Sequence, residues 1–181
     1  LSLLIFIPVL GALLMLPISK YLGPDKIKWT AFIATLIQFL LSIWLYMNFD
    51  SENGMQFVIQ VDWIKHFNIE YYLGVDGLSM PMVLLTSMLS FICIISSWKI
   101  DKKPLGYFSL FLLLDAGMMG VFVSLDFFLF YIFWEVMLLP MYFLIGMWGG
   151  PQRHYAAIKF FLFTLFGSVF MLLAMLGFYY Y

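Results

Sequence analysis

The sequence contains little charge and few of the side chains that bind metals or carry out covalent chemistry. Only 10% of its 181 residues are charged, against about a quarter in a typical soluble domain. Its single cysteine, Cys93, cannot form an internal disulfide or a cysteine-only metal site. The sequence has no metal-ligand cluster, glycine-rich phosphate loop or nucleophile elbow. We therefore expect no metal or cofactor site in this chain, and the net charge of −1 argues against a nucleic-acid partner.

Apolar residues, in contrast, are abundant. Hydrophobic side chains make up 65% of the sequence, more than a soluble domain of this size can bury in its core. The excess would form a large apolar surface, and such surfaces drive aggregation in water. A lipid bilayer is the solvent that suits this composition, so the chain is predicted to be an all-α membrane protein.

Six stretches are long and apolar enough to cross the hydrocarbon layer, which takes about 20 residues of helix. Their apolar runs are too continuous for the alternating strands of a membrane barrel. The predicted transmembrane helices are Leu1–Ser19, Trp29–Phe49, Ser79–Trp98, Gly106–Leu125, Asp126–Trp148 and Tyr155–Tyr181. We divide the chain into residues 1–77, two helices with a long loop, and residues 78–181, helices three to six.

The basic residues between these helices predict their direction. Basic residues favour the cytoplasmic side, so the loops that carry them are expected to face inward and the N-terminus outward. Loops two and four contribute only Lys65. Loops one, three and five carry seven basic residues, namely Lys20, Lys26, Lys28, Lys99, Lys102, Lys103 and Arg153.

The long second loop alternates apolar and polar residues on both sides of the short polar link 65–68. This period of two predicts a β-hairpin on the outer face, and an irregular amphipathic loop is the alternative. Ser79 is the expected N-cap of the third helix, with Pro81 tolerated in its first turn. The chain begins without Met and stops within the apolar run at Tyr181, so we expect a fragment of a longer protein.

Glu135 is the clearest case of an ionisable residue deep inside a predicted helix. It lies ~13.5 Å into the fifth helix at 1.5 Å per residue, close to mid-membrane. Pro140, five residues later, removes one helical hydrogen bond and frees the carbonyl of Val136. Ionisable residues at this depth are expensive and usually functional. Glu135 is therefore predicted to carry protons, and the alternative is an acid held permanently neutral or locked in an ion pair.

Two further ionisable residues lie inside predicted helices. Asp115 is expected at a similar depth on the fourth helix, either as a second acid on a polar path or as a residue that hydrogen-bonds neighbouring helices. Lys159 lies about one turn inside the sixth helix. Its long stem can reach the interface, or it can approach Glu135 through a bridging water.

Three stretches resemble one known family. They are Gly-Val-Asp-Gly-Leu-Ser at 74–79, the run from Asp126 through Trp134-Glu135 and Leu138-Leu139-Pro140 to Gly150, and Ala156-Ala-Ile-Lys159-Phe-Phe. Together they resemble subunit M, or chain 4, of the NADH-quinone oxidoreductase of respiratory complex I, an antiporter-like family.

The resemblance implies a bundle of about 14 helices, of which this chain is the amino-terminal part. It implies that Glu135 matches the family's buried glutamate and Lys159 a lysine on the inner half of the proton path. The main basic partner of that glutamate is a lysine on a seventh helix, outside the 181 residues. Asp115 matches no fixed family position.

The implied function is proton translocation in a bacterial inner membrane, driven by quinone reduction elsewhere in the complex. NADH, FMN, the iron–sulfur clusters and quinone are expected in other subunits, and the expected partners are membrane subunits, lipid and protons. Two alternatives are a subunit of an Mrp-type cation/proton antiporter and a membrane scaffold whose buried charges only fix helix packing.

Overall fold

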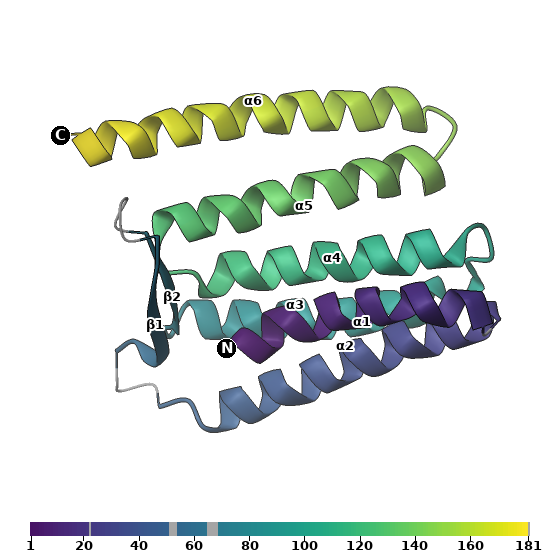
Figure 1. Cartoon of the computed structure of the whole chain (residues 1–181), viewed down its shortest axis with the longest axis horizontal. Helices are drawn as coiled ribbons and strands as arrows, with labels where there is room; N and C mark the ends of the chain where they lie inside the picture. Colours follow the sequence, from purple (N-terminus) through teal and green to yellow (C-terminus); the bar gives the residue numbers. More distant parts are fainter. Residues whose placement is uncertain (22, 51–53, 65–68, 181) are drawn as a thin grey trace.

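A computed structural model describes residues 1–21, 23–50, 54–64 and 69–180. The helices run side by side and antiparallel, with a two-stranded hairpin across one end (Figure 1). The α-helices are α1 (Ser2–Tyr21), α2 (Pro24–Met47), α3 (Ser79–Ser96), α4 (Pro104–Val123), α5 (Phe127–Trp148) and α6 (Arg153–Tyr180), and the strands are β1 (Gln56–Ile64) and β2 (Ile69–Val75).

Five of the predicted transmembrane helices are confirmed as helices long and apolar enough to span a membrane, namely α2 to α6. The first is also an α-helix, over Ser2–Tyr21. The side chains of residues 18–21 lie outside the described ones, so the described apolar part, Ser2–Pro17, leaves the full first span a prediction.

Helices α1 to α4 pack around two apolar clusters. One lies toward the hairpin end and joins Leu4 and Ile5 of α1 to Leu73 of β2 and Met119 of α4. The other surrounds Phe108, which is fully buried. Gly11 lets α1 approach α2 closely, since a Cβ there would lie 2.9 Å from the Cβ of Ala34. Small residues of this kind set the distance between membrane helices.

The predicted hairpin is confirmed. Strands β1 and β2 pair antiparallel, with Val61 opposite Tyr71. The register shifts near Phe57, whose φ of 53° is uncommon for a residue with a side chain and typical of a bulge. The predicted link, residues 65–68, lies outside the described residues. The Leu125 N–H donates to the Tyr72 carbonyl at 2.9 Å, which ties the hairpin to the connection between α4 and α5.

The predicted N-cap of α3 is wrong. Ser79 is the first helical residue, and its side chain makes no cap hydrogen bond. Instead, Oδ1 of Asp76 accepts from the backbone N–H groups of Leu78 (3.1 Å) and Ser79 (2.7 Å). These bonds, above all that from Ser79, stabilise the carboxylate and lower the pKa of Asp76 below its usual value of 3.8. Asp76, three residues before Ser79, is therefore the residue that caps the helix.

The loops that carry the basic residues lie at the end of the bundle opposite the hairpin (Figure 1). At that end the buried Lys28 pairs with the exposed Asp101 at 2.8 Å. Lys65 lies outside the described residues, and the orientation of the chain in a membrane stays a prediction. The division at residues 77 and 78 also stays a prediction.

Candidate functional site

Glu135 lies near the middle of α5. The helix begins with Asp126, whose Oδ1 accepts from the N–H groups of Phe128 and Leu129, both at 2.9 Å. Pro140 lies inside the same helix. The glutamate side chain is half-buried, and its Oε1 is buried without a hydrogen-bond partner among the described residues. A buried oxygen with a free lone pair can accept a proton or a hydrogen bond from water.

Tyr131 supplies a polar neighbour for the Glu135 carboxyl. It lies one helical turn before Glu135, and its hydroxyl interacts with the Glu135 carboxyl and with the buried Ser168 of α6. The carboxyl thus belongs to a small polar group between α5 and α6. A Tyr hydroxyl both donates and accepts, so this group can relay a proton as well as hold one.

Asp115 is found in a different environment, on the side of α4 that faces α3. It is fully buried and accepts a hydrogen bond of 2.5 Å from Ser90 of α3. Its second oxygen, Oδ2, is buried and has no hydrogen-bond partner among the described residues. The carboxyl also interacts with the side chain of Gln38 on α2. Asp115 is therefore surrounded by helices α2, α3 and α4.

The two acids face away from each other across the α4–α5 interface. Gly117 and Gly120 form the face of α4 that meets α5, since a Cβ at these positions would overlap Met137 and Phe133. Residue 115 is two positions from Gly117, about 200° around the helix. Glu135 likewise lies between Phe133 and Met137, on the other side of α5. The sequence predicted similar depths for the two acids, and the packing adds that they belong to separate polar groups.

Lys159 lies on the outer surface of α6. Its side chain is exposed, and its Nζ is 5.8 Å from the centre of the Tyr155 ring. This geometry is a weak cation–π contact. Lys159 makes no ion pair with Glu135. The sixth helix brings the lysine to the basic end of the bundle, so any contact with Glu135 has to pass through water or another chain segment.

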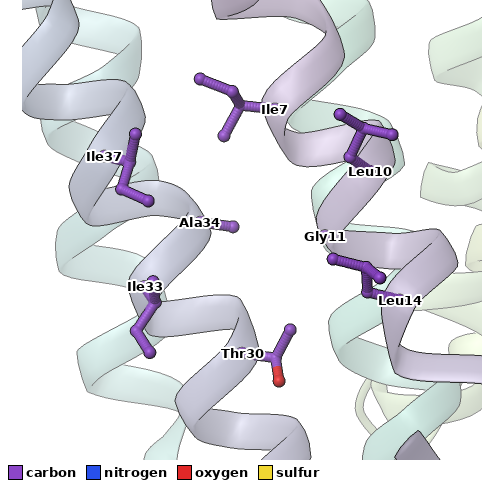
Figure 2. Close-up of a pocket in the computed structure, with 8 residues that line it drawn as sticks. All are labelled: Ile7, Leu10, Gly11, Leu14, Thr30, Ile33, Ala34 and Ile37. Carbon is purple, nitrogen blue, oxygen red and sulfur yellow. The ribbon is translucent and has the colours of Figure 1, made fainter.

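The described residues also form one apolar groove, between α1 and α2 (Figure 2). Seven of its eight lining residues are apolar, and the hydroxyl of Thr30 is the one polar side-chain group. No acid lines it. Within the described part of the chain, no three His, Cys, Asp or Glu residues gather closely enough to hold a metal ion. The polar chemistry therefore centres on Glu135 and Asp115.

Two known protein-family models match this chain. The model described as "NADH-ubiquinone oxidoreductase chain 4, amino terminus" matches residues 3–125, more than half of the chain. The chain belongs to the chain 4 family. The model described as "NADH:quinone oxidoreductase/Mrp antiporter, TM" matches residues 124–181, which include Glu135 and Lys159.

Relatives agree with this membership. The chain is 45% identical to the NADH-quinone oxidoreductase subunit M of Rhodobacter capsulatus, over 99% of this chain and 35% of that protein. It is 40% identical to the NAD(P)H-quinone oxidoreductase chain 4 of Prochlorococcus marinus, over 96% of this chain and 33% of that protein. The chain therefore spans about a third of the length of the relatives it matches.

Solved structures show the same fold. A chain of respiratory complex I from Thermus thermophilus with bound NADH superposes with a TM-score of 0.83 and 27% identity, over 97% of this chain and 35% of that one. A chain of the Mrp complex from Dietzia superposes with a TM-score of 0.79 and 20% identity, over 96% and 18%. The second likeness is in fold alone.

Sequence reasoning missed three polar residues that the fold brings to the acids. Tyr131 precedes Glu135 by four residues, and helical spacing alone would have placed the two on one face. Gln38 and Ser90 are uncharged residues inside apolar helices, and their link to Asp115 is set by how α2, α3 and α4 pack. The only available signal was an amide in the middle of a predicted transmembrane helix, which needs a partner there.

Proposed function

We propose that the chain is the amino-terminal part of a membrane-arm subunit of a proton-translocating NADH:quinone oxidoreductase, respiratory complex I, in a bacterial inner membrane. Protons move through Glu135 and bound water, with Lys159 on the inner half of the path. NADH, FMN, the iron–sulfur clusters and quinone belong to other subunits. Family membership and the names of the relatives support this proposal.

The observation that carries the proposal is the state of the Glu135 carboxyl. It lies mid-helix, with one oxygen buried and unpartnered and Tyr131 as its polar neighbour. A fully satisfied structural acid would have both oxygens hydrogen-bonded. An acid with a spare acceptor beside a hydroxyl is suited to bind a proton and pass it on.

Lys159 and Asp115 have less direct roles than Glu135 in the proposed proton transfer. Lys159 is exposed near the basic end of α6, where it supplies positive charge at the inner mouth of the path. The main basic partner of Glu135 lies outside the 181 residues, on a later helix. The role of Asp115 as a second acid of the path stays untested. Because Asp115 faces away from α5, we favour its other predicted role, a residue that joins neighbouring helices by hydrogen bonds.

A second candidate function is a subunit of an Mrp-type cation/proton antiporter. The description of the family that matches residues 124–181 names both systems. The two proposals differ in partners, because an oxidoreductase subunit assembles with redox subunits and an antiporter subunit does not. Purification of the full-length protein in mild detergent, followed by identification of the co-purifying subunits, separates them.

The test is Glu135→Gln in the full-length subunit, with NADH-driven acidification measured in membrane vesicles. Proton transfer by a positioned side chain contributes on the order of 100-fold or more, so pumping should fall by about that factor. Asp25→Asn, a change at an exposed acid in the first turn of α2, is the control and should pump normally. Normal pumping by an assembled Glu135→Gln complex would instead indicate a scaffold.

A further inference from the structure

A second polar site, separate from Glu135, lies among helices α1 to α4. It is built around an unusual backbone group. Pro8 has no N–H, so the carbonyl of Leu4, four residues earlier, has no helical donor. Nε2 of Gln38 on α2 donates to this carbonyl at 3.1 Å. Gln38 is fully buried, so its amide takes the place of the missing helical hydrogen bond.

This bond fixes the orientation of the Gln38 amide. The reverse orientation would put Oε1 against the Leu4 carbonyl, and two acceptors cannot hydrogen-bond each other. Nε2 therefore faces Leu4, and Oε1 is left buried without a donor among the described residues. The same is true of Oδ2 of Asp115, whose other oxygen accepts from Ser90. The side chains of Gln38 and Asp115 interact.

Two buried acceptors, Oε1 of Gln38 and Oδ2 of Asp115, lack a hydrogen-bond donor among the described residues. A single proton bound to one of them would provide that donor. We propose that Asp115 is protonated on Oδ2 and donates this proton to Oε1 of Gln38. Gln38 is then the residue that positions and retains the proton. One hydrogen bond then satisfies both oxygens, and neither is left buried without a partner.

The charges around the site support a neutral acid. An isolated carboxylate deep in a low-dielectric interior neutralises unless a cation pairs with it. Helix α2 carries two lysines, both in its first turns at the basic end: Lys26 is exposed, and Lys28 pairs with Asp101. Cys93 of α3 is exposed, and Tyr131 and Glu135 lie beyond the opposite face of α4. The side chain of Lys20 on α1 lies outside the described residues. No described cation therefore compensates an ionised Asp115.

The proton links four helices. It joins α4 to α2 through Asp115 and Gln38, while Ser90 adds α3 and the Leu4 carbonyl adds α1. Ser42 and Ser87, whose hydroxyls lie 2.6 Å apart, form a neighbouring pair between α2 and α3 that involves neither residue. Loss of the proton would leave an uncompensated charge and two buried acceptors without a donor at this junction. The site thus binds one proton and holds it tightly.

Infrared spectroscopy of the full-length subunit in its assembled complex tests the proposal at neutral pH. A protonated carboxyl has a C=O stretching band distinct from that of a carboxylate. Asp115→Asn should remove one such band, while the complex assembles normally because an Asn amide can donate to Gln38 and accept from Ser90. If no band is lost, Asp115 is ionised, with water between it and Gln38, and the proposal is overturned.

The role of Gln38 is tested separately. Gln38→Met keeps the length of the side chain and removes the acceptor, so the Asp115 band should shift to higher frequency. Ser42→Ala, in the neighbouring serine pair, is the control and should leave it in place. An unmoved band in Gln38→Met would show that Gln38 is not the proton's partner.

If Gln38→Met fails to assemble, Pro8→Ala gives a milder test. It restores an N–H donor to the Leu4 carbonyl and releases the Gln38 amide. A smaller shift of the same band is expected, and no shift would overturn the role of Gln38. Glu135→Gln should leave the Asp115 band unchanged, so this inference and the proposed pumping function can fail independently.

Discussion

The two parts of the molecule bury their acids in different ways. Helices α1 to α4 enclose Asp115 completely and give it a hydrogen bond from Ser90. Helices α5 and α6 leave Glu135 half-buried with an unpartnered oxygen, and most of the α6 side chains are exposed. The first arrangement suits an acid that keeps its proton. The second suits an acid that exchanges it, because water or another protein segment can reach the carboxyl.

The difference between Asp115 and Glu135 comes from how tightly the surrounding helices pack. Only 6% of the apolar window of α6 is buried inside the described chain, against 44% for α4. A helix with so little internal contact needs lipid or other protein around it. We therefore expect substitutions in α1–α4 to affect stability and substitutions in α5–α6 to affect function.

The largest stability effect is expected at Phe108, which is fully buried in α4. Phe108→Ala should lower the free energy of unfolding by about 3 kcal/mol, because it leaves a cavity that neighbouring side chains cannot fill. Phe163→Ala, at an α6 residue 81% exposed, is the matched control and should cost well under 1 kcal/mol. Unfolding of the purified subunit in mixed micelles measures both. Equal losses would show that α6 is covered by another segment.

A smaller effect is expected at the close contact between the two parts. A Cβ on Gly120 would lie 2.3 Å from the Phe133 ring. Gly120→Ala should cost about 1–3 kcal/mol through overpacking. Gly167→Ala, where a Cβ meets nothing within 4 Å, should be neutral or slightly stabilising. Thermal unfolding of the two variants compares them, and a neutral Gly120→Ala would contradict the tight α4–α5 contact.

The cap of α3 should contribute about 1 kcal/mol. Asp76→Ala removes two backbone hydrogen bonds at the start of the helix. Because folding lowers the pKa of Asp76, its contribution is present above the ordinary value of 3.8 and is lost as the pH falls through the lower folded value. Unfolding of wild type and Asp76→Ala at neutral and strongly acidic pH measures this. A difference that grows on acidification would contradict the capping role.

The smallest effect is expected at the basic end. Asp101→Asn removes the partner of Lys28, but Asp101 is 85% exposed and water screens the pair. We expect a loss below about 1 kcal/mol in the free energy of unfolding. A much larger loss would indicate that the buried Lys28 cation depends on this acid.

Much of the fold follows from the sequence because membrane helices are encoded locally. The long apolar runs specify α2 to α6, and the alternation around Ile59 and Tyr71 specifies the hairpin. The sequence chose Ser79 over Asp76 as the cap of α3. Cap choice depends on a few backbone angles, and composition does not record them.

The acids were identified from the sequence by their depth, since charge inside an apolar run is rare. The residues that surround them were not predicted. The partnership of Asp115 with Ser90 and Gln38 depends on helix rotation and on the carbonyl that Pro8 frees. Helix rotation is set by tertiary packing, as at Gly117 and Gly120, and a single sequence contains little information about it.

The most direct test of the account compares the two acids in one assay. Protons pumped per NADH oxidised are measured in vesicles carrying the full-length subunit with Glu135→Gln or with Asp115→Asn. We predict that Glu135→Gln lowers this ratio, whereas Asp115→Asn keeps it, because Asn offers the same hydrogen bonds as a neutral Asp115. An unchanged ratio in Glu135→Gln, or an equal fall in both variants, would contradict the division between an exchanging and a retaining acid.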